Sequence, residues 1–290
     1  MPTTLPPAIF DQVQTHLRAA ILSVHFAGGG DINDARLLET AKGHFFIKMN
    51  RGQQALQMFE TEAKGLQLLA STQAIRIPKP ITWDNTPDGA FLLLEYIETG
   101  HRDQHFWENF GTALANLHRH SAPFFGLDHD NFIGSLPQSN RRHDKWPEFF
   151  IRERLQPQLE LALQQGQLYR PDEQAFGKLF QQIPSLCPQE PPALIHGDLW
   201  NGNFLCDAAG RPVLIDPSAA YAHREMDLAM SRLFGGFDRP FYDSYQESFP
   251  LEPGFERRLP LFQLYYLLVH VNLFGGGYVG SVRNVVKGYV

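Results

Sequence analysis

Three side chains in this sequence have the types and the spacing that phosphoryl transfer from Mg-ATP requires. Asp198 and Asn203 lie five residues apart in the segment His-Gly-Asp-Leu-Trp-Asn-Gly-Asn, and Asp216 follows in Leu-Ile-Asp-Pro. One carboxylate must orient the attacking hydroxyl and accept its proton, while a carboxamide and a second carboxylate hold the magnesium ion that bridges the phosphates. We therefore expect Asp198 to be catalytic and Asn203 and Asp216 to bind Mg²⁺.

Protein kinases show the same order of residues, as H-R-D-x-x-x-x-N followed by D-F-G. Here Gly197 replaces the arginine and Pro217 replaces the phenylalanine, which favours a kinase that acts on small molecules. His196 and Asp198 also fit a metal hydrolase of the H-x-D type, but no further histidine or acid has suitable spacing. We interpret His196 as a buried residue that supports the loop.

The bulk properties are those of an ordinary globular protein. The chain has 290 residues, of which 43% are hydrophobic and 19% charged, and its net charge is −6. It has no Lys/Arg run that would favour nucleic acid, and no apolar run reaches the ~18 residues of a membrane-spanning helix. The start of the chain does not resemble a signal peptide, and two cysteines make no disulfide framework. We therefore expect a cytoplasmic protein without nucleic-acid or membrane partners.

Apolar periodicity predicts the elements that position these groups. The expected strands are 35–39, 44–49, 81–83, 91–96, 194–195 and 213–215. The expected helices are 9–24, 55–69, 106–119, 149–165, 172–182, 259–274 and one that begins at Glu225. Strands followed by helices predict an α+β, bilobal fold. We expect two lobes: a nucleotide-binding lobe, 1–97, and a helical lobe, 98–290. The helical lobe carries the catalytic loop and the substrate site.

A lysine and a glutamate in the first lobe are candidates for phosphate binding. Lys48 ends the apolar strand Phe-Phe-Ile-Lys, and Glu62 lies in the following helix with leucines four and seven positions further on. Such a lysine can reach the phosphates of ATP while the glutamate pairs with it. Glu60 is an alternative partner, but the apolar spacing favours Glu62. A solvated lysine at a strand end is the ordinary alternative.

Two further segments are candidates because of their position. Gly29 and Gly30, in a run of three glycines before the lysine strand, would let backbone N–H groups approach phosphates closely. A flexible turn is the alternative. Glu95, Tyr96 and Ile97 run from a buried strand into the lobe junction, where backbone groups would bind the adenine ring. An ordinary strand end explains these three residues equally well.

Substrate contacts are expected from loop residues in the second lobe. Trp200 lies in the catalytic segment, where it would stack on the substrate or pack between elements. Asn131, Gln138 and Asn140 would bind sugar hydroxyls, or would form Asx turns. Asp227 begins a helix, where it would cap the helix or accept backbone N–H bonds from the catalytic loop and hold it rigid.

Over nearly its whole length the sequence closely resembles the fructosamine kinase / ketosamine-3-kinase family. The resemblance is carried by HGDLWNGN, LIDPSAAYAHREMDLAM, FGLDHDNFIGSLPQSN and the block from Tyr242 to Gly277. It implies a protein-kinase-like fold of the aminoglycoside phosphotransferase type, with a small antiparallel-sheet lobe that includes a helix and a larger, mainly helical lobe. Some family members use a cysteine of the glycine-rich loop for redox control, and residues 28–35 contain none here.

The resemblance also implies an activity. Family members use ATP and Mg²⁺ to phosphorylate the 3-hydroxyl of ketosamines, whether small ketoamines or glycated lysines on proteins, and the product then decomposes and frees the amine. An aminoglycoside, amino-sugar or amino-alcohol kinase of the same fold is the alternative. An inactive ATP-binding or adaptor protein is disfavoured because Lys48, Asp198, Asn203 and Asp216 are all present.

Overall fold

The computed structural model describes residues 4–27 and 33–290. The chain forms two compact units. The first contains the residues up to Asp103 together with Leu205–Asp216, and the second contains Gln104–Phe204 together with Pro217–Val290. An antiparallel sheet dominates the first unit and helices dominate the second, so the predicted α+β class is confirmed.

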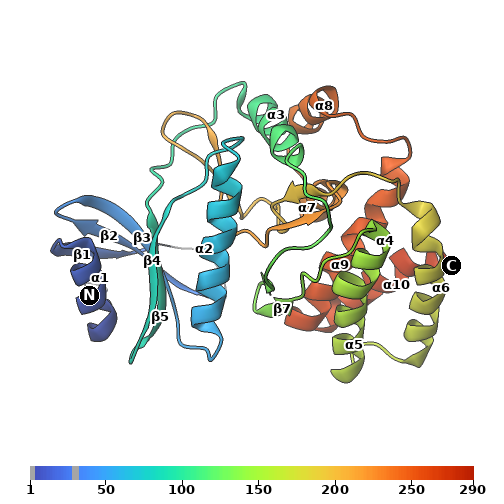
Figure 1. Cartoon of the computed structure of the whole chain (residues 1–290), viewed down its shortest axis with the longest axis horizontal. Helices are drawn as coiled ribbons and strands as arrows, with labels where there is room; N and C mark the ends of the chain where they lie inside the picture. Colours follow the sequence, from blue (N-terminus) through green and yellow to red (C-terminus); the bar gives the residue numbers. More distant parts are fainter. Residues whose placement is uncertain (1–3, 28–32) are drawn as a thin grey trace. The chain divides into compact units, whose positions relative to one another are not determined.

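The first unit is built on a five-stranded antiparallel sheet of order β1-β2-β3-β5-β4. Its strands are β1 (Ile21–Phe26), β2 (Asp34–Thr40), β3 (Gly43–Asn50), β4 (Pro80–Thr86) and β5 (Gly89–Glu95). Two helices, α1 (Pro7–Leu17) and α2 (Ala55–Ser71), cover its opposite faces (Figure 1). Because side chains alternate along a strand, Phe91 and Leu93 of β5 pack on the α1 side. Ala90, Leu92 and Leu94 therefore face α2.

The predicted helix over 9–24 is wrong in its second half. The helix ends at Leu17, Arg18 adopts the left-handed conformation with φ of 48°, and Ile21–Phe26 forms β1. This segment is rich in β-branched and aromatic residues, and pairing with β2 supplies hydrogen bonds that outweigh its weak helical periodicity. The other strands and the helix predicted in this unit are confirmed to within a few residues.

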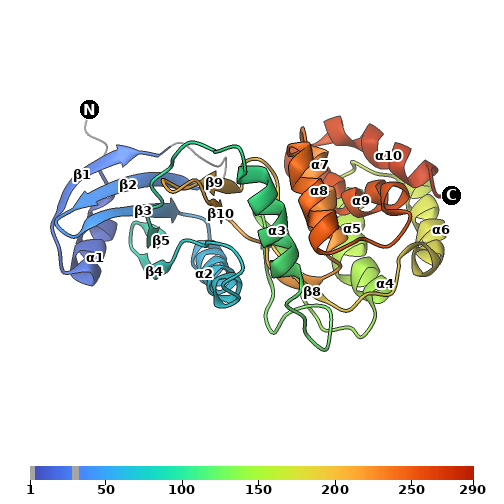
Figure 2. The same cartoon turned by 90° about the horizontal axis from the view of Figure 1, so that it is seen from above.

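A short hairpin carries the chain back into the first unit and ends at Asp216. Its strands are β9 (Phe204–Cys206) and β10 (Pro212–Leu214), which Figure 2 shows side by side. The amide of Gly100 donates to the carbonyl of Cys206 (2.9 Å), and that of Leu214 donates to the carbonyl of Arg76 (3.0 Å). These bonds fix the backbone two residues before Asp216.

The second unit is mainly helical, and its elements surround the long helix α9. The helical segments are α3 (Phe106–His118), α4 (Trp146–Phe149), the π-helix η1 (Phe150–Leu155), α5 (Gln156–Gln164), α6 (Arg170–Leu186), α7 (Glu225–Leu233), α8 (Arg239–Ser248), α9 (Phe255–Phe274), the 3₁₀ turn η2 (Gly276–Tyr278) and α10 (Val279–Lys287). Two small antiparallel pairs complete it: β6 (Asn131–Ile133) with β7 (Leu136–Gln138), and β8 (Ala193–Ile195) with β11 (Ala220–Ala222). The sequence did not predict α8 and α10.

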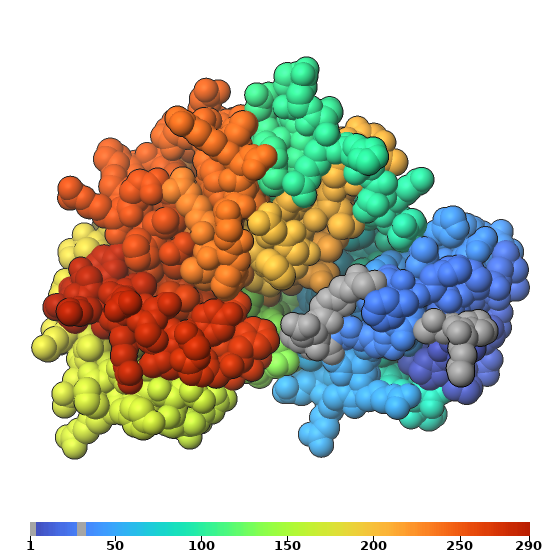
Figure 3. All heavy atoms as spheres, turned by 180° about the vertical axis from the view of Figure 1, so that it is seen from behind, coloured from blue at the N-terminus to red at the C-terminus, as the bar shows by residue number. Residues whose placement is uncertain are grey.

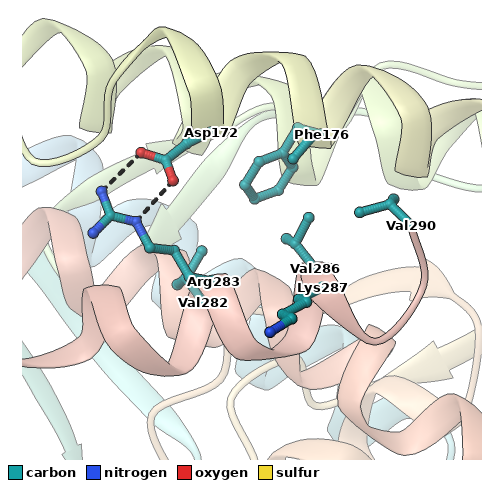
Figure 4. A pocket seen from close by; sticks show the side chains of 8 residues that line it. Asp172, Phe176, Val282, Arg283, Val286, Lys287 and Val290 are labelled. Carbon is teal, nitrogen blue, oxygen red and sulfur yellow. Dashed lines mark hydrogen bonds and ion pairs between the residues drawn. The ribbon is translucent and has the colours of Figure 1, made fainter.

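Helix α10 lies on the surface of the second unit, where it is dark red in Figure 3. It buries Val282 and Val286 and packs beside α6, and Arg283 pairs with Asp172 through two nitrogen–oxygen contacts of 2.8 and 2.9 Å. Figure 4 shows the mainly apolar pocket between the two helices. None of the predicted site residues lines it. In the described part of the chain, every helix is too short or too polar to cross a membrane.

Candidate active site

A buried ion-pair cluster in the first unit contains three of the predicted residues. Lys48 Nζ on β3 donates to Glu62 Oε1 on α2 at 2.7 Å and to Asp216 Oδ1 at 2.5 Å. Alternation along β3 explains this geometry, because Ile47 packs on the α1 side and Lys48 therefore faces α2. Of the two candidate glutamates, it is Glu62 that pairs with Lys48.

The other candidate, Glu60, lies on the exposed side of α2. Its carboxylate pairs with Lys64 one turn further on at 2.8 Å. Both side chains are more than 40% exposed, at 42% for Lys64 and 43% for Glu60. A surface pair of this kind contributes little to stability. Glu60 therefore belongs to the solvated face of the helix.

The charges of the Lys48 cluster are mutually stabilised. Burial by itself lowers the pKa of Lys48, but the carboxylates of Asp216 and Glu62 outweigh burial, so the pKa is raised and the ammonium stays charged. Burial is also the main cause that raises the pKa of Glu62, with Lys48 opposing it and Asp216 adding to it. Two carboxylates share one ammonium, and the excess negative charge suits an added cation.

Asp216 is the member of this cluster that is open to solvent. Its side chain is 41% exposed, compared with 15% for Glu62 and 7% for Lys48. Its backbone φ of 55° lies in the left-handed region, which aspartate tolerates better than most residues. A carboxylate that is bonded on one side and exposed on the other can accept a metal ion.

In the second unit, the segment that follows β8 is held by a buried aspartate at the start of α7. Asp227 accepts the backbone N–H of His196 at 2.7 Å and that of Gly197 at 2.8 Å. The buried His196 ring then accepts the N–H of Asp198 on Nδ1 at 3.3 Å. Three successive amides are thus bound by side chains, which is the loop support that the sequence suggested for Asp227 and His196.

Gly197 is required by close backbone packing at this point. Its φ is 85°, and a Cβ atom there would lie 2.1 Å from the carbonyl oxygen of Ser218. Ser218 in turn donates its N–H to the carbonyl of His196 at 2.9 Å. The glycine therefore allows the catalytic segment and the segment after Asp216 to bond to each other directly.

Asn203 orients Asp198. Its Nδ2 donates to the carbonyl oxygen of Asp198 at 2.8 Å and to the carboxylate Oδ2 at 2.9 Å. Because the amide nitrogen is directed at Asp198, the side-chain oxygen of Asn203 is the atom suited to bind a cation. Amide and carboxylate oxygens are the donors that Mg²⁺ prefers, so Asn203 and Asp216 have the right chemistry for this ion.

A histidine that the sequence reasoning missed also holds Asp227. His118, the last residue of α3, approaches the carboxylate through Nε2 at 3.2 Å and the hydroxyl of Tyr245 through Nδ1 at 2.8 Å. Since a carboxylate can only accept, Nε2 carries the proton and Nδ1 accepts from the tyrosine. A histidine on the apolar face of a helix was the signal in the sequence that could have pointed to a buried polar partner.

The three amides expected to contact a sugar bond mainly to protein atoms instead. Asn131 Oδ1 accepts from Gln138 Nε2 at 2.8 Å and from Asn140 Nδ2 at 2.9 Å, while Asn131 Nδ2 donates to the carbonyl of Ala219 at 2.9 Å. The hydroxyl of Tyr265 donates to Gln138 Oε1 at 2.5 Å. All three amides are buried. We therefore assign them a supporting role beneath the segment that follows Asp216.

Trp200 remains a partly exposed residue of the catalytic segment. Its side chain packs over Gly202, where a Cβ atom would lie 2.5 Å from the indole ring. The ring meets Phe234 edge-on with 6.5 Å between centroids, and Trp200 is 38% exposed. Part of the indole is therefore accessible to a ligand. Stacking of Trp200 on a substrate stays a prediction.

The residues expected to bind adenine are Glu95, the last residue of β5, and the two residues that follow it. The amide of Glu95 donates to the carbonyl of Lys79 at 2.9 Å, and its carboxylate pairs with Arg76 at 2.9 Å. Tyr96 is half-buried and Ile97 is buried. Binding of adenine by their backbone groups stays a prediction. The expected phosphate contacts of Gly29 and Gly30 fall outside the described residues.

A second cluster has metal-ligand residue types but is already neutralised. Potential ligand atoms of Glu190, His223 and Glu225 lie within 4.8 Å of one another. However, Arg224 bonds both oxygens of Glu190, and Arg258 bonds both oxygens of Glu225. The amide of Glu225 donates to His223 Nδ1, so the neutral ring carries its proton on Nε2 and has no lone pair there. We interpret this cluster as structural.

The fold and these groups define a protein-kinase-like phosphotransferase. A solved structure of aminoglycoside 2′-phosphotransferase-IIIa shares the fold, with a TM-score of 0.64 at 17% identity over 97% of this chain and 98% of that chain. The family model described as fructosamine kinase matches residues 7–290, and the chain belongs to that family. It is therefore an ATP-dependent phosphotransferase.

Relatives match over most of their length. A ketosamine-3-kinase of Mus musculus is 34% identical over 297 residues, covering 93% of this chain and 95% of the relative. A chloroplastic protein-ribulosamine 3-kinase of Oryza sativa subsp. indica is 39% identical over 280 residues, covering 93% of this chain and 79% of the relative. The crystal structure of a candidate fructosamine-3-kinase from Thermobifida fusca has a TM-score of 0.87 at 33% identity, covering 97% and 98% of the two chains. The fold of this family is therefore shared along the whole chain.

Proposed function

We propose that the protein uses ATP to phosphorylate the 3-hydroxyl of ketosamines, which are fructosamine or ribulosamine adducts of amines or of protein lysines. The phosphorylated adduct then decomposes and frees the amine, so the reaction leads to deglycation. The observation that supports the proposal is a segment in which Asp227 holds the backbone and Asn203 holds Asp198, in a chain whose relatives include a ketosamine-3-kinase and a protein-ribulosamine 3-kinase. Both free cysteines are buried, which fits a reducing cytoplasm.

Asp198 is the catalytic residue of the proposal. The attacking group is an alcohol, whose pKa lies far above 7, so full deprotonation before transfer is unfavourable. Asp198 therefore orients the hydroxyl and accepts its proton as the new bond forms. The two bonds from Asn203 keep the carboxylate in place for this task. Positioning and neutralisation of charge supply most of the rate enhancement.

Asn203 and Asp216 are the proposed ligands of Mg²⁺, and Lys48 is the proposed contact to the phosphates. Bound Mg²⁺ would neutralise charge on the phosphates of ATP. Lys48 is charged and already directed by two carboxylates. If Asp216 bound a metal ion, Glu62 would still hold the ammonium. One acid would then bind the metal ion while the other holds the lysine, which accounts for two acids beside one lysine.

Nucleotide and sugar contacts complete the proposal. The backbone of Glu95, Tyr96 and Ile97 would bind adenine, and the indole of Trp200 would stack on the sugar. The buried amides of Asn131, Gln138 and Asn140 support the loop through their bonds to protein atoms.

The test compares ATP consumption with ribulosyl-lysine, fructosyl-lysine and kanamycin, followed by location of the phosphate in each product. We expect transfer to the 3-hydroxyl of the two ketosamines and little transfer to kanamycin. A preference for kanamycin would instead support an aminoglycoside kinase, and a preference for a simple amino sugar or amino alcohol would support a kinase for those compounds. Binding of ATP without any product would support an inactive ATP-binding protein.

A further inference from the structure

Helix α9 carries an aromatic stripe on one of its faces. Tyr266, His270 and Phe274 follow one another at intervals of four residues, so they lie on the same face of the helix. Tyr266 is buried, at 1% exposure. From there the face becomes progressively exposed, and Phe274 is 57% exposed.

Other rings extend this stripe into a continuous surface. The His270 ring lies 4.6 Å from Phe234, 5.4 Å from Phe274 and 5.0 Å from Tyr278, measured between centroids. Phe234 in turn meets the indole of Trp200. We call Trp200, Phe234, His270, Phe274 and Tyr278 the aromatic strip. All of them belong to the second unit, and the strip begins two residues after Asp198.

His270 gives the strip a hydrogen-bond acceptor. Its Nδ1 lies 2.8 Å from the carbonyl oxygen of Tyr266, and because a carbonyl can only accept, Nδ1 carries the proton. Burial lowers the pKa of His270, so the ring is neutral near pH 7 and Nε2 presents a lone pair. The strip thus combines ring faces that attract cations with an acceptor for an N–H group.

We infer that the aromatic strip binds the amine part of the ketosamine, with the secondary ammonium against the ring faces and its alkyl chain extending toward Phe274. The inference rests on the proposed function. In a ketosamine only three carbon atoms separate the nitrogen from the 3-hydroxyl, so the amine substituent must leave the reacting centre past residues adjacent to Asp198. Trp200 follows Asp198 by two residues, and Phe234 meets its indole ring. The occupant is therefore an alkylammonium group such as the side chain of a glycated lysine.

The test uses three acceptors built on one ketose: the 1-amino-1-deoxy sugar, its N-butyl derivative and the uncharged 1-O-butyl ether. The native enzyme is expected to have a lower KM for the N-butyl compound than for the ether. In Phe234→Leu we expect that preference to fall by roughly threefold to fivefold, as loss of one exposed cation–π contact predicts. The unsubstituted amino sugar carries an ammonium at the same position, so its KM should also rise in this variant.

A matched control is Tyr169→Leu, which removes an aromatic ring that is 60% exposed but lies outside the strip, before α6. It should leave all three KM values unchanged, and thermal melting of each variant checks folding. Equal losses for the N-butyl and O-butyl compounds in Phe234→Leu would overturn the cation–π role. Unchanged KM values would overturn the subsite itself. Failure of the native enzyme to phosphorylate any ketosamine would refute the proposed function, a result that is distinct from both.

Discussion

Asp227→Asn should both destabilise the second unit and slow catalysis, although Asp227 does not touch a reacting atom. The native carboxylate is fully buried and accepts the amides of His196 and Gly197 as well as His118 Nε2. An asparagine keeps one acceptor oxygen and presents an NH₂ group where the other was, so one buried N–H loses its partner. A buried donor left without a partner costs about 1.5–3 kcal/mol when the lost acceptor was charged.

For a protein of this size, each kcal/mol lowers the melting temperature by about 2–4 °C, so we expect a fall of roughly 3–12 °C. Steady-state kinetics on the folded variant should show a lower kcat and a nearly unchanged KM for ATP, because the Lys48 cluster lies in the other unit. The control is Asp243→Asn, whose carboxylate is 58% exposed and pairs only with Arg239 among the described residues. If Asp227→Asn melted at the native temperature, the reasoning about the loop amides would be refuted.

Four further predictions follow from the site and its supports. Asp198→Asn should keep ATP binding in a calorimetric titration but lower kcat by several orders of magnitude, and near-native turnover would contradict the assigned role. Glu62→Gln should raise the KM for ATP, whereas Glu60→Gln, on the exposed face of α2, should not. Burial by itself raises the pKa of Asp207, but hydrogen bonds to it lower the pKa to about 2 from an ordinary 3.8, so its contribution to stability is present above pH 3.8 and is lost as the pH falls toward 2. The melting temperatures of the native protein and of Asp207→Asn should therefore converge over that interval, and a constant difference would argue against the shift. Gly202→Ala should displace the tryptophan indole that packs on it and raise the KM for the sugar substrate but not for ATP.

Contacts among the candidate site residues could be predicted where their spacing is local. Asp198 and Asn203 are close in sequence, so the loop that joins them dictates their contact. The pairing of Lys48 with Glu62 also follows from a strand and the next helix, fourteen residues apart. In both cases the pattern of apolar neighbours indicates which side chain faces inward, and the structure has those contacts.

The role of the three amides could not be predicted in the same way. Whether an amide meets water or protein depends on segments that pack against it from far along the chain. Asn131 bonds to the carbonyl of Ala219 across 88 residues, and Gln138 bonds to Tyr265 across 127 residues. From the sequence alone, a polar residue between helices is predicted to be a solvated loop residue, because its bonding partner is not visible there. The strand Ile21–Phe26 was misjudged for a related reason, since only its pairing with β2 distinguishes it from helix.

The contact between Lys48 and Asp216 joins residues 168 positions apart, and it bears on the proposed role of Lys48. Its two carboxylates differ in exposure, since Glu62 is largely covered and Asp216 is open. A cation that binds Asp216 would weaken the attraction of that carboxylate for Lys48 and release part of the ammonium's hydrogen-bonding capacity. Glu62 cannot leave without exposing a buried charge, so it keeps the ammonium in place. Under the proposed roles, Lys48 would be free to turn toward phosphates only when a metal ion bound Asp216, and this would couple phosphate binding to metal binding.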